Sequence, residues 1–173
     1  MTLAVRLITP AEAQARREAL AELLVDAVEG GASVNFVRPM TRAKAEAWWA
    51  SALAGHARGE RLVLVAEAEG RIDGSVQVVP AAQENQAFRA DVAKLLVHRR
   101  ARRQGLGEAL MRAAEAEAAR IGRTLLNLDT EAGSAAERLY VRLGWTKLGE
   151  VPGFATTADG TRRAAASFFF KAL

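Results

Sequence analysis

A basic, glycine-bearing turn stands out at Arg102-Arg103-Gln104-Gly105-Leu106-Gly107. The run before it, residues 91–97, alternates and then becomes continuously apolar, which is typical of a half-buried strand entering a core. After it, apolar residues recur at helical spacing as far as Ile121. A helix that begins near Gly105 directs its first free N–H groups, and the positive end of its dipole, into the turn. The sequence therefore predicts a site for an anion such as phosphate.

The spacing Arg-x-x-Gly-x-Gly after a strand resembles the Gln/Arg-x-x-Gly-x-Gly/Ala signature of the Gcn5-related N-acetyltransferase (GNAT) superfamily. Neither the Gly-x-x-x-x-Gly-Lys-Ser/Thr run of nucleoside-triphosphate loops nor the Gly-x-Gly-x-x-Gly dinucleotide fingerprint occurs here. In the superfamily, the amides of this turn hold the pyrophosphate of acetyl-coenzyme A (acetyl-CoA). The resemblance implies cofactor contacts from Arg102, Arg103, Gln104, Gly105, Leu106, Gly107 and Glu108.

A second segment strengthens the resemblance. Residues 125–130 have the pattern of a strand, residues 134–143 that of a short amphipathic helix, and Gly144 suits the end of that helix. The segment is similar to the superfamily's Ala-x-x-Leu-Tyr-x-x-x-Gly-Phe/Trp motif, matched here by Ala136, Leu139, Tyr140, Gly144 and Trp145. Many members have Asn seven residues before the tyrosine, where this chain has Gly133. The resemblance, which spans residues 91–149, therefore implies cofactor contacts from Ser134 and Ala136.

The family fold implies that the strands ending near Val97 and Asp129 are parallel neighbours that splay apart, with the acyl-pantetheine chain in the opening. Backbone groups of Leu95, Leu96 and Val97, unpaired where the sheet opens, are then expected to bind the pantetheine amides as a strand would. A backbone N–H near Val97 is the expected donor to the thioester carbonyl.

Two side chains are candidates for proton transfer. Tyr140 is the only tyrosine, and it lies where the family often places its general acid, although a packing aromatic is the plainer alternative. Asp129 ends its strand facing the opening, as a base for the amine does, but an Asp near a helix N-terminus more often caps the helix. The segment from Leu128 to Tyr140 is similar to the tabtoxin-resistance acetyltransferase branch, in which such residues are base and acid.

These observations predict an acetyl-CoA-dependent N-acetyltransferase acting on the amine of a small molecule, which in that branch is an amino-acid-like antimetabolite or antibiotic. Direct attack is expected, because the chain has no cysteine to carry an acyl group. The alternatives are a protein N-terminal or lysine acetyltransferase, a non-catalytic acyl-CoA-binding module, and a DNA-contacting protein. The four arginines between His98 and Arg103 suit the last of these, but no aromatic residues interleave them. Phosphates of coenzyme A are therefore favoured, and no nucleic-acid partner is expected.

The elements follow from periodicity and caps. A strand at residues 3–8 precedes Thr9-Pro10-Ala11-Glu12, which is a strong helix start, and that helix is expected to reach Glu29. Further elements are expected as a helix from Thr41 to about Gly55 that carries Trp48 and Trp49, strands at 62–68, 71–79 and 91–97, a helix from 105, and strands at 125–130, 145–148 and 166–172. This order predicts an α/β fold: one GNAT domain over residues 1–173, with a mixed, mostly antiparallel sheet of about seven strands flanked by about four helices.

Composition sets the remaining expectations. Half of the chain is hydrophobic and a quarter is charged, so it should be globular, and the net charge of +4 is modest. Arg6 interrupts the first apolar run, and no apolar stretch reaches membrane-spanning length. We therefore expect a cytoplasmic protein with no membrane partner, and a homodimer is possible. Neither His56 nor His98 has ligand partners at metal spacing, so no metal is expected.

Overall fold

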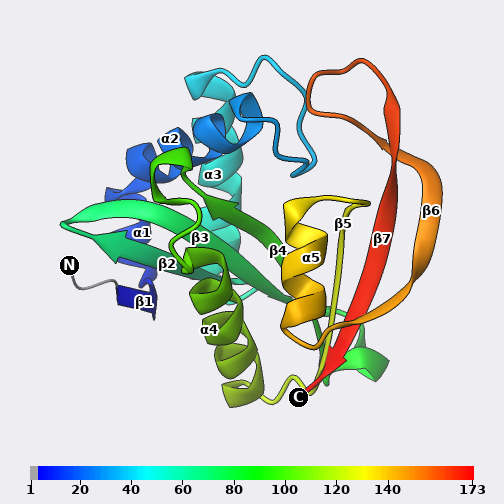
Figure 1. Cartoon of the computed structure of the whole chain (residues 1–173). Helices are drawn as coiled ribbons and strands as arrows, with labels where there is room; N and C mark the ends of the chain where they lie inside the picture. The colour runs from blue at the N-terminus through cyan, green and yellow to red at the C-terminus, as the bar shows by residue number, and fades with distance from the viewer. Residues whose placement is uncertain (1–3) are drawn as a thin grey trace.

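The computed structural model describes residues 4–173, and its seven strands form one sheet in the order β1-β2-β3-β4-β5-β7-β6 (Figure 1). The strands are β1 (Ala4–Leu7), β2 (Leu62–Ala68), β3 (Arg71–Pro80), β4 (Arg89–Val97), β5 (Leu125–Glu131), β6 (Thr146–Thr156) and β7 (Arg163–Ala172). All neighbouring strands are antiparallel except β4 and β5. The predicted α/β class and the mixed, mostly antiparallel sheet are confirmed.

The helices are α1 (Pro10–Ala15), α2 (Arg17–Glu29), α3 (Arg42–Ala57), α4 (Leu106–Arg120) and α5 (Ala135–Arg142), and two 3₁₀ turns are η1 (Glu84–Gln86) and η2 (Arg99–Ala101). The predicted start of α1 is confirmed, because the Glu12 N–H donates to Thr9 Oγ1 (3.3 Å) and the Thr9 N–H donates to Glu12 Oε2 (2.9 Å). Such a cap stabilises a helix by about 1 kcal/mol.

The single helix expected from Thr9 to Glu29 is instead two helices. The backbone leaves the helical path at Arg16, where φ is −107° and ψ is 17°. The Arg16 side chain reaches the β2–β3 hairpin, where it pairs with Glu67 and donates to the Gly70 carbonyl at 2.7 Å. The break depends on this distant contact, and no proline or glycine marks it in the sequence.

Helices cover both faces of the sheet (Figure 1). On one face, α1, α2 and α3 pack over a core that includes Leu20, Trp49 and Val65. On the other face, α4 packs over Leu64 and Val76. Gly74 lets α4 approach closely, since a Cβ there would lie 2.8 Å from Leu110 Cδ1.

The parallel pair is short and divides the sheet. Only Arg89, Ala90 and Asp91 of β4 are paired with β5, opposite Leu125, Leu126 and Asn127. Beyond Asp91, β4 continues for six residues to Val97, bonded to β3 alone. The two strands thus separate into a fork, as predicted, and each arm of the fork has a free backbone edge.

The C-terminal hairpin is longer than expected. The strand predicted at residues 145–148 is β6, Thr146–Thr156, and the strand predicted at 166–172 begins at Arg163. Nearly every residue of β6 is exposed, and its pairing with β7 shifts register twice. An edge strand with no buried face lacks the alternation from which strands are predicted.

Candidate active site

The turn before α4 presents a row of backbone N–H groups. Within the described residues, the amides from Arg103 to Glu108 donate to no protein acceptor, and the first helical bond there is from Ala109 N to Gly105 O at 3.0 Å. Gly105 has φ 81° and Arg103 has φ 61°, so successive amides point to a common side, as in an anion-binding nest. The predicted helix start is confirmed, and the turn has the geometry of an anion site.

The four arginines of residues 99–103 form two pairs with different contacts. Arg99 binds Asp26 through its backbone N–H (2.9 Å) and its Nε (2.8 Å). Arg100 binds Asp73 through Nε at 2.7 Å. Arg102 Nε donates to the Val97 carbonyl at 3.2 Å, and Arg103 has no ion-pair partner among residues 4–173. Two arginines therefore fasten η2 to the body of the protein, and two remain beside the nest.

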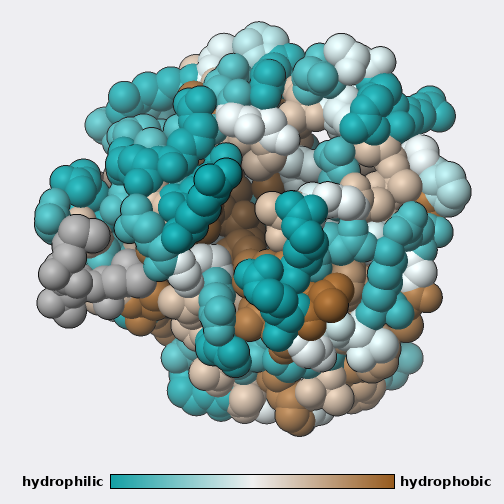
Figure 2. Space-filling model, viewed as in Figure 1, coloured by the Kyte–Doolittle hydropathy of each residue, from teal (hydrophilic) through white to brown (hydrophobic). Residues whose placement is uncertain are grey.

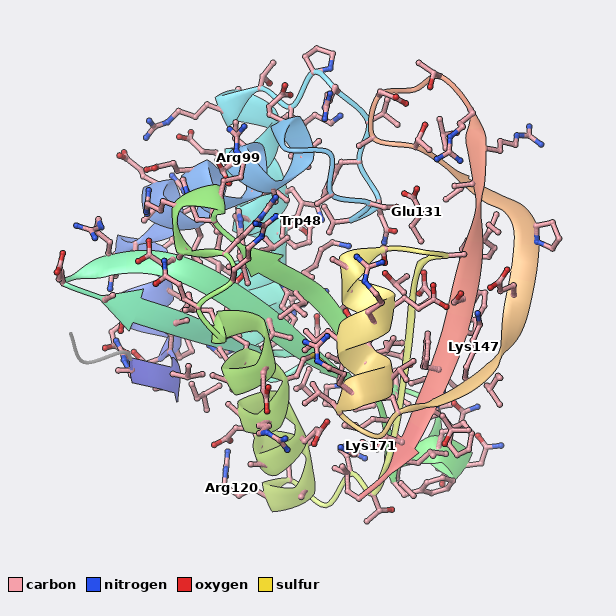
Figure 3. The ribbon with its side chains drawn as sticks, in the orientation of Figure 1. Trp48, Arg99, Arg120, Glu131, Lys147 and Lys171 are labelled. Carbon is pink, nitrogen blue, oxygen red and sulfur yellow. The ribbon has the colours of Figure 1, made fainter. Side chains whose placement is uncertain are left out.

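Asp26 is the anchor of η2. Although burial acts to raise its pKa, the hydrogen bonds from Arg99 and the charge of His98 hold the pKa below its usual value. The carboxylate therefore stays ionised and ties α2 to the segment that follows β4. His98 also caps η2, because its Nδ1 accepts the Arg100 N–H at 3.2 Å. Figure 3 shows Arg99 beside the α2 end of the molecule.

Three residues of β4 were predicted to bind the pantetheine chain through their backbone, and the structure shows which of them direct backbone groups towards the fork. Successive residues of an antiparallel strand direct their backbone groups to opposite sides. The His98 N–H donates to Asp73 O on the β3 side at 2.9 Å, so the Leu96 backbone also faces β3. Leu95 and Val97 are therefore the residues whose backbone groups face the fork, and Leu96 contributes its side chain to the core instead.

A β-bulge in β4 brings Lys94 into the site, and the sequence analysis did not single this residue out. Gln77 pairs with Ala93 and Ser75 pairs with Leu96, so Lys94 and Leu95 both lie opposite Val76. Lys94 has φ 54°. A bulge re-aims the side chains that follow it. Here it turns Lys94 to the face of α3, where its Nζ lies 5.6 Å from the centre of the Trp48 ring.

Asp129 lies on the opposite arm of the fork, two residues beyond the last paired residue of β5. It forms no ion pair and accepts no hydrogen bond from another described residue. It does not cap α5, because Ser134 is the cap residue and its Oγ accepts the Glu137 N–H at 3.1 Å. Burial raises the pKa of Asp129, Lys94 opposes this shift, and Asp91 adds to it. The carboxyl group is thus free, and its environment makes it a stronger base than an ordinary aspartate.

Tyr140 projects from α5 towards the same fork. Its ring packs against Phe169 (centroids 5.9 Å apart) and Trp145 (6.1 Å). Only 6% of the residue is exposed. Its hydroxyl bonds to no described residue, yet it is not among the fully enclosed unsatisfied atoms. Burial, and then the charge of Asp129, raises the pKa of Tyr140. The phenol is therefore neutral at physiological pH, with its hydroxyl left free at the edge of the core.

Ion pairs hold α5, and with it Tyr140, in place. Glu137 accepts bonds from Lys147 Nζ on β6 (2.7 Å) and from Ser167 Oγ on β7 (2.9 Å). Lys171 Nζ bonds both the Leu143 carbonyl and Glu115 of α4 at 2.8 Å. Figure 3 shows Lys147 beside β7 and Lys171 below the lower end of α5. The tyrosine is thus fixed from three elements.

A hollow opens between the turn before α4 and α5. Figure 2 shows hydrophobic atoms at its floor and hydrophilic side chains around its rim. The two tryptophans of α3 differ in burial, because Trp49 is fully buried while Trp48 is partly exposed beside Lys94. The sequence-predicted groups Tyr140 and Asp129, the nest, and the free edge of β4 all converge on this part of the molecule.

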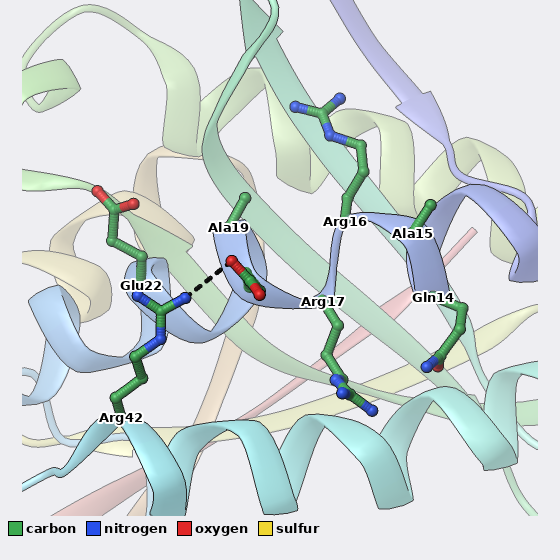
Figure 4. Close-up of a pocket in the computed structure, with 8 residues that line it drawn as sticks. Gln14, Ala15, Arg16, Arg17, Ala19, Glu22 and Arg42 are labelled. Atoms are coloured by element: carbon green, nitrogen blue, oxygen red, sulfur yellow. Dashed lines mark hydrogen bonds and ion pairs between the residues drawn. The ribbon is translucent and has the colours of Figure 1, made fainter.

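A surface depression lies elsewhere. It has a volume of about 520 Å³ and lies where α1 gives way to α2, beside the start of α3 (Figure 4). Its lining includes Arg16, Arg17 and Arg42 together with Glu18 and Glu22, and Arg42 pairs with Glu18 at 3.0 Å. The described part of the chain holds no group of three potential metal-ligating side chains, and none of its helices is long and apolar enough to cross a bilayer. The fork, with the unpaired amides of the turn, the Asp129 carboxylate and the Tyr140 hydroxyl, is the candidate site for chemistry.

Because the pKa of Asp129 is raised, its ionised carboxylate should lower the free energy of unfolding at neutral pH. The ionised carboxylate is less favourable in the folded chain than in the unfolded chain, so stability falls as the pH rises through the window between the ordinary and the raised pKa. We expect Asp129→Asn to increase the free energy of unfolding at pH 7, and this gain should vanish below about pH 4, where unfolded aspartate is protonated. Urea unfolding across a pH series measures both.

Asp159 provides a control, because its pKa is shifted in the opposite direction from that of Asp129. Hydrogen bonds from the side chain of Thr157 and from Thr161 lower its pKa to about 2. Its ionised form is therefore favoured by folding, so Asp159→Asn should destabilise the protein at pH 7, with the loss shrinking in acid. If both substitutions shifted stability in the same direction at pH 7, the environment of Asp129 would differ from the one described.

Comparison with proteins of known sequence supports a family assignment. The chain is 37% identical over 106 residues to an uncharacterized N-acetyltransferase of the hisH-hisA intergenic region of Azospirillum brasilense. That match covers 60% of this chain and 61% of the relative, so the chain spans less than two thirds of the relative's length.

Solved structures share the whole fold. Ribosomal-protein-alanine N-acetyltransferase from Brucella melitensis superposes with a TM-score of 0.78 at 26% identity, covering 98% of this chain and 99% of that one. The yncA protein from Salmonella typhimurium, solved with its cofactor acetyl-CoA, superposes with a TM-score of 0.76 at 22% identity, covering 100% and 95% of the two chains.

The family assignment depends on the segment of the chain that builds the fork. Residues 59–147, from the start of β2 to the start of β6, match the acetyltransferase (GNAT) domain model. These residues are more than half of the chain and include the nest, Lys94, Asp129 and Tyr140. The predicted tabtoxin-resistance branch is not confirmed by these relatives. The chain belongs to the GNAT acetyltransferase family, whose members use acetyl-CoA.

Proposed function

We propose that this protein transfers the acetyl group of acetyl-CoA to the amine of a small molecule by direct attack. The observation that carries the proposal is the convergence of three free groups on one fork: the amides of the nest, the Asp129 carboxylate and the Tyr140 hydroxyl. The amides suit a diphosphate, and the other two groups suit the gain and loss of a proton.

The residues present fit acetyl-CoA. Arg103 and the amides from Arg103 to Glu108 would hold the pyrophosphate, with Arg102 beside them. Glu108 would contribute its N–H, because its carboxylate is turned to Arg112 at 2.9 Å. Leu95 and Val97 would bond the pantetheine amides along the free edge of β4. Ser134 would contribute only its O–H, because its oxygen caps α5, while Ala136 would make an apolar contact.

The bound cofactor supplies an activated thioester, and the chain supplies the proton transfers. Asp129 accepts the proton that the attacking amine loses as the carbon–nitrogen bond forms. The Val97 N–H donates to the carbonyl oxygen while it carries negative charge. Tyr140 donates its hydroxyl proton to the sulfur as the carbon–sulfur bond breaks. The buried phenol is neutral and therefore has this proton to give.

A second acceptor class has one observation in its favour. The 26% identity to ribosomal-protein-alanine N-acetyltransferase extends over 98% of this chain, so the N-terminal amine of a protein is the alternative acceptor. A non-catalytic acyl-CoA-binding role would leave Asp129 and Tyr140 without a purpose at the fork.

Thiol release from acetyl-CoA tests the proposal and separates the acceptors. The purified chain should release coenzyme A faster with members of a small-amine panel than with water alone. Peptides with an N-terminal alanine serve as the competing substrate class. Faster release with the peptides would favour the protein N-terminus as acceptor. Saturable binding of acetyl-CoA by calorimetry without release for any amine would indicate a binding module.

A further inference from the structure

We propose that the acceptor carries an anionic group, with a carboxylate as the simplest case, close to its reacting amine, and that Lys94 binds this group. The proposal rests on the proposed acetyl transfer and names the class of acceptor: a zwitterion of the α-amino acid kind. The observations that support it are the orientation of Lys94, its lack of a counter-ion, and the position of Asp129 on the facing arm of the fork.

The bulge in β4 gives Lys94 its orientation. In a regular strand, Lys94 would point to the same face as Val92, which packs in the core under α4. The extra residue opposite Val76 turns Lys94 to the α3 face instead. A non-glycine residue in the left-handed region costs free energy, and the φ of Lys94 is 54°. Such a cost is usually found where the resulting side-chain direction has a function.

Lys94 has no acidic partner. It makes no ion pair and no hydrogen bond within the described part of the chain, and burial lowers its pKa. Charges without a counter-ion are rare in partly buried positions, because desolvation is not repaid. An anionic ligand would restore the balance and would hold the lysine in its charged form.

The neighbourhood of Lys94 offers donors but lacks acceptors. Arg61 also has no ion pair within residues 4–173, and its charge reaches Lys94. Arg61 Nη1 donates to Gln77 Oε1 at 3.0 Å. Two further buried donors of this pair, Arg61 Nε and Gln77 Nε2, have no acceptor. Asp129 lies on the facing arm of the fork and forms no ion pair with these donors, so the donors are complementary to the carboxylate of a ligand.

The opposite arm of the fork completes the match to a zwitterion. Asp129 carries the free negative charge, and its pKa and that of Lys94 respond to each other's charge. The two groups form no ion pair with each other. An α-amino acid has its ammonium and carboxylate groups on one carbon, so Asp129 would bind the amine while Lys94 binds the carboxylate. Trp48 and Phe36, whose rings are 5.7 Å apart, would line the side-chain end.

Lys44 provides a matched control. Both Lys94 Nζ and Lys44 Nζ lie 5.8 Å from the centre of the Phe36 ring, but Lys44 is exposed on α3. If the role of Lys94 were only to pack on aromatic rings, Lys94→Met and Lys44→Met would act alike on catalysis. A role in binding the acceptor anion predicts that only Lys94→Met changes substrate preference.

Matched pairs of acceptors provide the measurement. Each α-amino acid that serves as an acceptor is compared with its carboxamide, which keeps the amine and the side chain but lacks the charge. In the wild-type protein we expect kcat/KM to favour the acid, and in Lys94→Met the preference should fall by roughly 10- to 100-fold. Lys94→Arg should retain part of the preference for the acid. An equal loss for acid and amide, or an unchanged preference, would overturn the assignment.

A binding readout separates this proposal from the proposed function. Trp48 lies 5.6 Å from Lys94 Nζ, so its fluorescence should report a carboxylate bound there. Titration of the full chain with α-amino acids, with coenzyme A present, should saturate in wild type but not in Lys94→Met. The Trp48→Phe variant identifies the signal. Saturation without acetyl transfer would leave the anion site standing and remove the proposed function. Acetyl transfer to amines, with no preference for the acid over its amide and no saturating fluorescence signal, would remove the anion site and leave the proposed function standing.

Discussion

Tyr140→Phe is expected to lower turnover by roughly 10²- to 10⁴-fold, the usual contribution of a general acid. The affinity for acetyl-CoA should stay close to that of wild type, because we propose that the α4 turn, and not α5, holds the cofactor's phosphates. The tyrosine hydroxyl bonds to no described residue, so its loss removes no internal hydrogen bond. Stopped-flow or steady-state turnover, with calorimetry for cofactor binding, separates the two quantities.

The pH profile distinguishes an acid from a packing residue. Because burial and Asp129 raise the pKa of Tyr140, the wild-type rate should not decline near pH 10, where an ordinary tyrosine ionises. The ring contacts with Phe169 and Trp145 remain in the Phe variant, so its free energy of unfolding should be unchanged or slightly higher. Turnover equal to that of wild type would remove Tyr140 from the mechanism.

Gly105→Val is expected to abolish most of the affinity for acetyl-CoA. Nothing lies within 4 Å of a Cβ built at Gly105, so the substitution meets no steric obstacle. Its effect comes from φ, which is 81° and which a β-branched residue adopts only at a cost of about 1–3 kcal/mol. If the turn relaxes to avoid this cost, the amides no longer point to a common side. Calorimetric titration with coenzyme A measures the loss.

Gly122 at the other end of α4 serves as the matched control. It has φ 74° and also has nothing within 4 Å of its Cβ position. Gly122→Val should therefore reduce stability by a similar amount while leaving coenzyme A affinity intact. If both variants bound the cofactor as wild type does, the nest would not be the pyrophosphate site.

Local signals in the sequence predicted most of the fold. The capping box at Thr9, the cap at Thr41 and the glycine before α4 each act through neighbouring residues, so the helix starts were correctly predicted. The break at Arg16 and the length of β6 were not. The first depends on a contact to Gly70, more than fifty residues away, and the second on a strand that is exposed on both faces.

The candidate site was also predicted in part, where its residues belong to local sequence motifs. Spacing identified the nest, Tyr140 and Asp129, because each belongs to a contiguous motif. Lys94 was missed, since a bulge is defined by pairing with a partner strand and leaves no mark in the sequence of β4. The alternative that Asp129 caps α5 is excluded, because the hydroxyl of Ser134 is the cap, and the role of Asp129 as a base stays a prediction. Only the assembled structure shows which of two nearby polar residues reaches the helix.

The three residue pairs that join β4 to β5 also have a mechanical consequence. Four strands lie on one side of this seam and three on the other, and few backbone bonds cross it. Amides at the seam should exchange with deuterium sooner than those of β2 and β3. A chain cut in the loop after α4 should yield two fragments that can reassemble, so the fork that we propose as the active site is also the natural line of division for a split reporter.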